Sequence, residues 1–187
     1  MARTDLMDLL ARAKAEGWTE LDLAGMDLEE LPPDIGDLAQ LEVLIFGEVD
    51  GETGAEKGHR LRALPLELGR LARLKTVNLS LSERGELPEG LDHLRQITTL
   101  FLWDNRLREL PEALGHLTQL TTLNVSGNQL RELPIWLGNL TQLTTLDVSF
   151  NQLEILPQEL DHLAQLTTFF ALSNQLRELP EALGNLT

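Results

Sequence analysis

A unit of 23 residues is repeated four times in phase in the second half of this chain, from Ile97 to Thr187. Each copy carries an asparagine and a Leu-Pro pair at fixed places. The asparagines are 23 residues apart, at Asn105, Asn128, Asn151 and Asn174. The Leu-Pro pairs keep the same step, at Leu110-Pro111, Leu133-Pro134, Leu156-Pro157 and Leu179-Pro180. A fixed period of this length is typical of a solenoid, in which each unit forms one coil that packs on its neighbours.

Apolar residues recur every two or three positions within a unit, and neither a helix nor an ordinary strand explains this spacing over the whole unit. One unit reads Leu120-x-x-Leu123-x-Val125-x-x-Asn128-x-Leu130-x-x-Leu133-Pro134-x-x-Leu137-Gly138-x-Leu140. This pattern resembles the leucine-rich repeat family. It is most similar to the bacterial type, including the repeat segments of Roco-type proteins. The resemblance implies an α/β solenoid, a right-handed superhelix with a concave parallel β-sheet and a convex side of loops and short helical turns.

Counting in steps of 23 extends the repeats over residues 18–187. The seven units start at Trp18, Leu41, Leu74, Ile97, Leu120, Leu143 and Leu166. Residues 1–17 precede them and predict an N-terminal capping helix from Asp5 to Glu16, with Thr4 as its N-cap and Gly17 as its stop. We expect this helix to cover the first hydrophobic edge of the solenoid with its apolar face, which consists of Leu6, Leu9, Leu10 and Ala13.

The second unit contains ten extra residues, because its Leu-Pro pair follows the first after 33 residues instead of 23. They lie within residues 47–58, an acidic segment with four glycines and four carboxylates. Such a composition predicts a mobile surface loop. Partner contact is one alternative. Calcium binding is another, although EF-hand spacing is absent, and its ligands would be Asp50, Glu52 and Glu56.

The asparagine of each unit is expected to be buried, with its amide bonded to backbone groups of its own turn and of the next unit. Asn105, Asn128, Asn151 and Asn174 would thus form a structural asparagine ladder. Three residues at the equivalent positions differ. Ser82 is expected to replace the asparagine in part, whereas Met26 and His59 are expected to weaken the ladder. In the same region Arg84 stands where a core leucine is expected, so Leu81 is expected to turn inward.

The formal charge of −15 is unevenly distributed. Residues 1–60 contain 15 acidic and 5 basic side chains, net −10, and residues 61–187 contain 15 and 10, net −5. This field disfavours nucleic acid and anionic membranes and favours a basic partner near the N-terminal third, with plain solubility as the alternative. The chain has no cysteine, no signal-peptide pattern and no stretch that approaches a membrane span. We therefore expect a cytoplasmic protein with no nucleic-acid or membrane partner.

Catalytic motifs are absent from the sequence, which has neither a Gly-x-x-x-x-Gly-Lys-Ser/Thr phosphate loop nor a Gly-x-Ser-x-Gly elbow. His93, His116 and His162 share one repeat position on the predicted convex side. Exposed turn residues explain them better than a metal site, which needs more converging ligands. The repeated carboxylates are interpreted as solvating side chains: Glu109, Glu132 and Glu178. We expect no enzymatic activity, no metal and no cofactor.

The concave face is the most informative surface, because strand alternation places the third, fifth and seventh residues of each unit there. The third position is mostly threonine, which suits an exposed strand. At the fifth, seventh and eighth positions, some units carry large apolar residues where others have small or polar ones. The predicted partner-binding residues are Phe101, Trp103, Asn124, Asp147, Phe150, Phe170 and Leu172. The apolar residues of this set would be anchors, and Asn124 and Asp147 would give directional contacts. The alternative is that these side chains pack only on one another or on a second copy of the chain.

Two functions follow from these features. The first is a non-enzymatic protein-protein interaction scaffold that binds a protein or peptide on the concave face. The alternative is a regulatory or dimerising repeat domain of a larger, Roco-type multidomain protein. The last unit has no capping segment, which would allow self-association through its exposed leucines, Leu166, Leu176, Leu179, Leu183 and Leu186.

Overall fold

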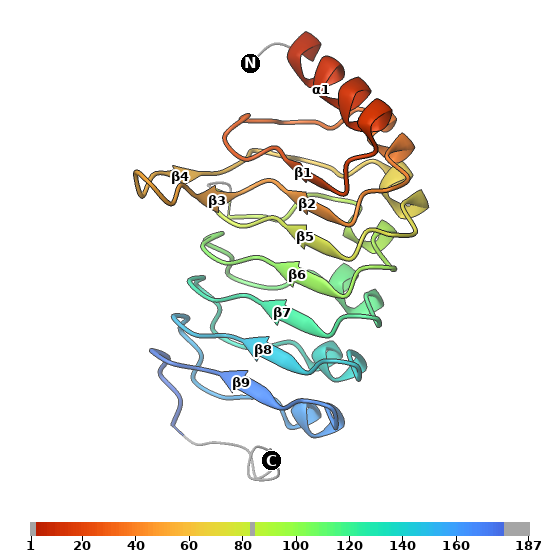
Figure 1. Ribbon diagram of the computed structural model, residues 1–187. Helices are drawn as coiled ribbons and strands as arrows, with labels where there is room; N and C mark the ends of the chain where they lie inside the picture. Colours follow the sequence, from red (N-terminus) through yellow and green to blue (C-terminus); the bar gives the residue numbers. More distant parts are fainter. Residues whose placement is uncertain (1–2, 83–84, 178–187) are drawn as a thin grey trace.

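The computed structural model describes residues 3–82 and 85–177, which form one continuous stack of coils (Figure 1). Seven short parallel strands pair edge to edge in the order β1-β2-β5-β6-β7-β8-β9. The solenoid predicted from the repeat is thereby confirmed. The strands are β1 Glu20–Asp22, β2 Val43–Ile45, β5 Thr76–Asn78, β6 Thr99–Phe101, β7 Thr122–Asn124, β8 Thr145–Asp147 and β9 Thr168–Phe170.

Short 3-10 helices form the opposite side of the stack, as the resemblance implies. They are η1 Pro33–Asp37, η2 Leu66–Arg70, η3 Leu91–His93, η4 Glu112–His116, η5 Ile135–Asn139 and η6 Gln158–His162. The proline of the Leu-Pro pair precedes most of them in an extended conformation. Pro111 before η4, for example, has φ −68° and ψ 145°. Proline fixes φ and lacks an N–H group, so the Leu-Pro pair determines where the helical turn begins in each of these coils except that of η3, which Gly90 precedes.

The leucines of the repeat fill the space between the strands and the 3-10 helices. The central strand residues Leu100, Leu123 and Leu146 are fully buried. The asparagine that follows each of the strands β6 to β9 satisfies the backbone around it. Asn128 donates from Nδ2 to the carbonyl oxygens of Leu102 and Val125, each over 2.9 Å. Its Oδ1 accepts from the backbone N–H groups of Asn105 and Leu107 in the preceding coil.

The irregular third unit differs in part from the expectation. Leu81 turns inward and is only 5% exposed. Ser82 is buried, but its hydroxyl oxygen has no hydrogen-bond partner among the described residues. The prediction that Ser82 partly replaces the asparagine is therefore wrong, because its side chain is too short to reach the carbonyl groups that the longer amide reaches. The side chain of Asn105 serves instead and accepts a hydrogen bond from the Ser82 backbone N–H over 2.6 Å.

His59 substitutes for an asparagine better than expected. It is 3% exposed, and its Nδ1 accepts a hydrogen bond from the Leu61 backbone N–H over 3.2 Å. Its Nε2 lies 3.3 Å from the carbonyl oxygen of Leu79 in the next coil. The imidazole also makes an edge contact with Phe46, with ring centroids 5.8 Å apart. Histidine thus ties the second coil to the third.

The insertion is a β-hairpin rather than the plain loop that its composition predicts. Strands β3 Glu48–Val49 and β4 Glu56–Lys57 pair in antiparallel fashion and project from one edge of the stack (Figure 1). Asp50 organises the turn, because its Oδ1 accepts bonds from the backbone N–H groups of Glu52 and Thr53 while Lys57 Nζ lies 2.8 Å from Oδ2. These contacts supply the order that glycine-rich composition alone did not indicate.

Helix α1, Arg3–Glu16, lies against the first coil with Leu6, Leu10 and Ala13 buried and Leu9 half-buried. It includes Thr4, which is therefore not at the predicted N-cap position. At the other end of the described chain, Leu166 is 4% exposed, contrary to the expectation, because it belongs to the continuous hydrophobic core. Leu176 is half-buried, and the remaining leucines of the predicted exposed edge lie outside the described residues: Leu179, Leu183 and Leu186. In the described part of the chain, no helix has the length and apolar character to span a membrane.

Candidate functional site

The strand register aligns the predicted columns across the sheet. Threonine lies beside threonine at the third position, as in Thr99, Thr122 and Thr145. The fifth-position column follows the same pairing and reads Asp22, Ile45, Asn78, Phe101, Asn124, Asp147 and Phe170. Strands are about 4.8 Å apart, so the two phenylalanines, three strands apart, are separated by about 14 Å.

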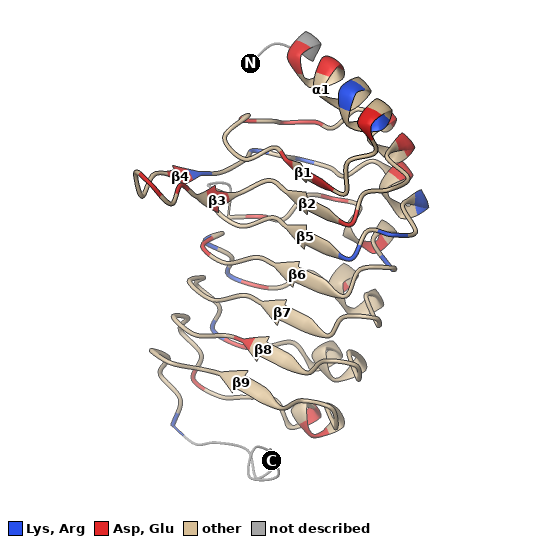
Figure 2. Ribbon diagram, viewed as in Figure 1, with Lys and Arg blue, Asp and Glu red and all other residues tan. Residues whose placement is uncertain are grey.

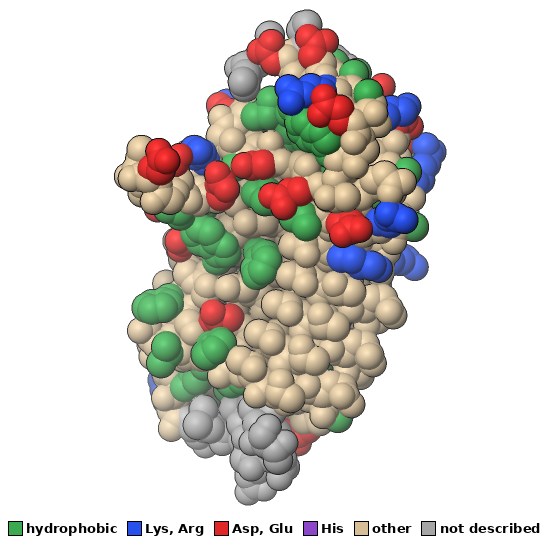
Figure 3. All heavy atoms as spheres, viewed as in Figure 1, with side chains coloured by type: hydrophobic (Ala, Val, Ile, Leu, Met, Phe, Trp, Pro, Cys, Tyr) green, Lys and Arg blue, Asp and Glu red, His purple; other side chains and the backbone are tan. Residues whose placement is uncertain are grey.

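The apolar residues predicted to bind a partner reach the surface to different extents. Phe150, Phe170 and Leu172 are exposed, by 61%, 46% and 66%, whereas Phe101 and Trp103 are half-buried. We refer to these five residues as the aromatic patch. Figure 3 shows hydrophobic side chains gathered on this face over β6 and again over β8 and β9, with an acidic side chain between the two groups. The patch therefore has two apolar parts separated by a polar strip.

Asn124 and Asp147 occupy that polar strip, and each uses one oxygen to close a turn. Asn124 Oδ1 accepts from the backbone N–H of Ser126 over 2.9 Å. Asp147 Oδ1 accepts from the backbone N–H of Ser149 over the same distance. Within the described residues, Asn124 Nδ2 and Asp147 Oδ2 have no hydrogen-bond partner. One donor and one charged acceptor thus remain available between the apolar parts.

Phenylalanine at the fifth position cannot close this turn, and a serine of the preceding coil replaces the missing acceptor. The Trp103 backbone N–H donates to Ser80 Oγ over 3.2 Å. The Leu172 backbone N–H donates to Ser149 Oγ over the same distance. Both serines are buried. Sequence reasoning missed their role, although a serine 23 residues before the seventh position of each phenylalanine-containing coil is a readable signal.

Phe150 has the positive φ that the eighth position takes in most coils. Its φ is +55°, and φ is also positive at Gly25, Leu81, Asp104, Gly127 and Ser173. A bulky side chain is disfavoured at positive φ, and such strain costs on the order of 1–2 kcal/mol. The strand turn therefore requires a left-handed residue here, and Phe150 fills the position without gaining burial.

Acidic residues surround the N-terminal part of the concave face. Figure 2 shows them on α1, β1 and the hairpin, whereas β8 is the only strand from β5 to β9 that carries one, Asp147. Near the aromatic patch, burial raises the pKa of Asp104, and the neighbouring Glu56 carboxylate raises it further. In the hairpin, the hydrogen bond from Lys57 lowers the pKa of Asp50 well below its usual range. The field over this face is negative.

The described residues contain no group of three or more histidine, cysteine, aspartate or glutamate side chains that could hold a metal ion. The histidine column does not converge: His116 and His162 are exposed, and His93 is half-buried. Of the repeated carboxylates, Glu109 and Glu132 are exposed, and Glu178 lies outside the described residues. The arrangement offers apolar surface and hydrogen-bonding groups.

Comparison with known proteins agrees with this geometry. The family described as Leucine Rich repeats (2 copies) matches residues 95–137 and 118–165. No curated protein matches the chain. The resemblance to Roco-type repeat segments stays a prediction.

Solved structures of leucine-rich repeat proteins are similar over most of the chain. The leucine-rich repeat domain of the type III effector XopL aligns with a TM-score of 0.73 and 24% identity, over 95% of this chain and 60% of that one. A leucine-rich repeat protein of Leptospira interrogans aligns with a TM-score of 0.56 and 25% identity, over 95% of this chain and 55% of that one. The plant peptide hormone receptor RGFR1, solved in complex with RGF2, aligns with a TM-score of 0.59 and 25% identity, over 84% of this chain and 25% of that one. The chain thus spans only part of the length of each. The repeat, the stacked parallel strands and these similarities show that the chain has the leucine-rich repeat solenoid fold, and residues 95–165 match the family itself.

Proposed function

We propose that this chain is a non-enzymatic interaction scaffold whose concave sheet binds a protein or peptide. The conformation of Phe150 is the observation that carries the proposal. An aromatic side chain that is 61% exposed and held at positive φ costs stability, whereas glycine fills the position in two other coils and the only other large apolar residue there, Leu81, is buried. Local strain of this kind is typical of functional positions. A partner that covers the ring would supply the burial that the free protein lacks.

The rest of the aromatic patch supports the same surface. Exposed aromatic side chains grouped on one face are characteristic of interface anchors. The serines that support the Trp103 and Leu172 amides leave the apolar side chains at these positions free to face outward. Asn124 and Asp147 then offer hydrogen bonds between the two apolar parts. A bound segment would bury the apolar side chains and take its register from the polar strip.

The charge of the concave face indicates the character of the partner. Asp147 lies in the polar strip between the two apolar parts of the aromatic patch, and the acidic side chains of β1 and the hairpin lie beyond the patch. A partner with basic residues would complement both, and complementary charge raises the rate of association. RGFR1, a structural relative of this chain, was solved in complex with RGF2, which supports a binding role for this type of fold.

The proposal is tested by selecting peptides from a displayed random library against the 187-residue chain. The affinity of the selected peptides is then measured for variants. Trp103→Ala and Phe170→Ala should each weaken binding at least tenfold, as expected for anchors worth about 2 kcal/mol. Ile135→Ala is the matched control, since Ile135 is a 69% exposed hydrophobic residue in η5 on the opposite side. Peptides that bind all three variants equally would contradict a concave site.

The alternative function is a regulatory or dimerising repeat domain of a larger, Roco-type protein. The alternative predicts that the oligomeric state of the chain changes with protein concentration, whereas the scaffold function does not require this. Light scattering of the chain over a range of concentrations, with and without Trp103→Ala, separates the two. A monomer at all concentrations agrees with the scaffold, whereas a dimer that survives Trp103→Ala favours the alternative.

A further inference from the structure

The returning limb of each coil, which follows the strand turn, carries a charged residue at the twelfth position of most units. Three pairs of neighbouring coils place opposite charges there, Glu29 with Arg62, Arg131 with Glu154 and Glu154 with Arg177, and ion pairs join the first and the last. Arg62 lies 3.0 Å from Glu29 of the preceding coil, and Arg177 lies 2.9 Å from Glu154. The stack therefore satisfies these arginines internally with carboxylates at the same repeat position.

Arg108 and Arg131 break this pattern. They occupy the twelfth position of two consecutive coils, so two positive charges are neighbours in a protein of net charge −15. Both are exposed, and within residues 3–82 and 85–177 neither makes an ion pair or a hydrogen bond. The equivalent residue of the coil before Arg108 is Gly85, which has no side chain to offer.

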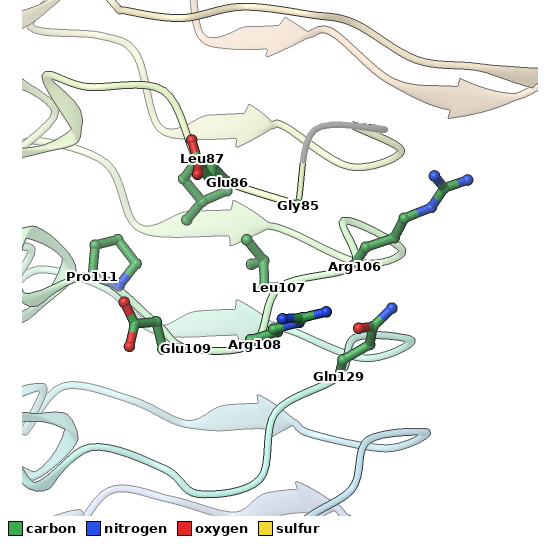
Figure 4. Close-up of a pocket in the computed structure, with 9 residues that line it drawn as sticks. All are labelled: Gly85, Glu86, Leu87, Arg106, Leu107, Arg108, Glu109, Pro111 and Gln129. Atoms are coloured by element: carbon green, nitrogen blue, oxygen red, sulfur yellow. The ribbon is translucent and has the colours of Figure 1, made fainter.

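These two arginines line a surface hollow of about 430 Å³ together with Gln129 and Gln152, and we call these four residues the arginine groove. Both glutamines are half-buried, and their side-chain amides have no hydrogen-bond partner among the described residues. A neighbouring hollow shares Arg108 and Gln129. In it, Glu109 points away from Arg108 (Figure 4). The groove thus presents two guanidinium groups and two amides, and its lining contains no carboxylate.

We infer that the arginine groove binds a phosphate group. Guanidinium groups donate paired, charge-assisted hydrogen bonds that match the geometry of phosphate oxygens. Two of them balance the charge of a phosphate dianion, and the glutamine amides can donate to the remaining oxygens. The phosphate is either a free small anion or part of a phosphorylated side chain. This surface is separate from the aromatic patch, so its role does not depend on the function proposed above.

The test is an NMR titration of the ¹⁵N-labelled chain with inorganic phosphate, and in parallel with a short synthetic phosphoserine peptide and its unphosphorylated form. The pH is kept above about 7, where phosphoserine is a dianion. Sodium chloride at equal ionic strength corrects for screening. Phosphate should shift the amide signals of the arginine groove. Binding of both probes identifies a small-anion site, and binding of the phosphopeptide alone identifies a site for a modified protein; both support the inference.

The double variant Arg108→Gln, Arg131→Gln should lower the affinity at least about tenfold, because each lost charge-assisted bond is worth a similar factor. Arg62→Gln, at the same repeat position in an ion pair, is the matched control and should change nothing. Arg108→Glu places a carboxylate beside Arg131, so it should abolish phosphate binding without lowering Tm. Shifts no larger than those with chloride, or shifts unchanged in the double variant, would overturn the inference.

Discussion

Ser80 Oγ accepts a hydrogen bond from the backbone N–H of Trp103, which lies one coil further along the stack. The Ser80 backbone N–H is itself bonded to Asn78 Oδ1 over 3.0 Å. In the next coil Phe101 stands at the position of Asn78 and cannot accept the equivalent bond. The serine of one coil therefore makes an aromatic residue tolerable in the next.

Replacing Ser80 by alanine should leave the Trp103 amide without a partner. Removing one member of a buried hydrogen bond costs about 1–3 kcal/mol, so the free energy of unfolding should fall by that amount. Ser126→Ala is the control. Ser126 has the same repeat position, but its hydroxyl donates only within its own coil, to Asn124 Oδ1 over 2.7 Å. Urea denaturation measures both variants. Equal losses would show that the bond between coils contributes nothing of its own.

Phe150→Gly should separate stability from binding. Glycine removes the strain of positive φ, which stabilises the fold by about 1–2 kcal/mol. It also raises the conformational entropy of the unfolded chain, which destabilises the fold by about 0.5–1 kcal/mol. The free energy of unfolding should therefore stay constant or rise by up to about 1.5 kcal/mol. Affinity for a concave-face ligand should fall, because the exposed ring is lost. Phe150→Ala keeps the strain and serves as the control, with lower stability than the glycine variant. A marked loss of stability in Phe150→Gly would mean that the ring packs for the fold.

The stacking of the coils could be predicted because its determinants are periodic in sequence. The step of 23 residues predicts Thr99, Thr122 and Thr145 in one column, and the strand register agrees. Alternation along each strand likewise indicated that Phe101 and Phe170 face outward. These inferences needed only the period of the repeat and of the strand.

Features that depend on contacts across the stack could not be predicted in this way. The positive φ of Phe150 follows from the geometry of the turn and leaves no trace in the residue itself. A few contacts of Asp50 and Lys57 stabilise the hairpin. A glycine-rich composition predicts a loop and does not indicate these contacts. His59 was expected to weaken the ladder, yet its Nε2 lies 3.3 Å from the carbonyl oxygen of Leu79 in the next coil. Whether an imidazole can bridge two coils depends on such distances, which the sequence does not give.

Asn128→Ala should destabilise the chain strongly. The substitution leaves the N–H groups of Asn105 and Leu107 without their acceptor. The carbonyl oxygens of Leu102 and Val125 each lose one of two amide donors, because Asn105 and Asn151 still donate to them. Two unsatisfied buried N–H groups together should cost about 3 kcal/mol or more. Asn139→Ala, at an exposed position of η5, should cost less than about 0.5 kcal/mol. Thermal and urea unfolding compare the two, and a similar small effect of both would contradict a structural ladder.

His59 should make the stability of the fold depend on pH. Burial lowers the pKa of His59 below its ordinary value of 6.5, because the charged imidazole is poorly solvated and its Nδ1 already accepts the Leu61 N–H. The unfolded chain therefore binds a proton first as pH falls. The stabilisation is complete above pH about 6.5 and is lost as pH falls towards the lower, folded pKa. His59→Asn introduces the amide that four other coils have at this position and removes the titration, while the other three histidines are unchanged. The difference in unfolding free energy between the two chains should thus shift in favour of the variant between pH about 7.5 and 5.5, by at most about 1.4 kcal/mol per pH unit. Parallel pH curves would mean that the imidazole accepts a proton without loss of its bonds between the second and third coils.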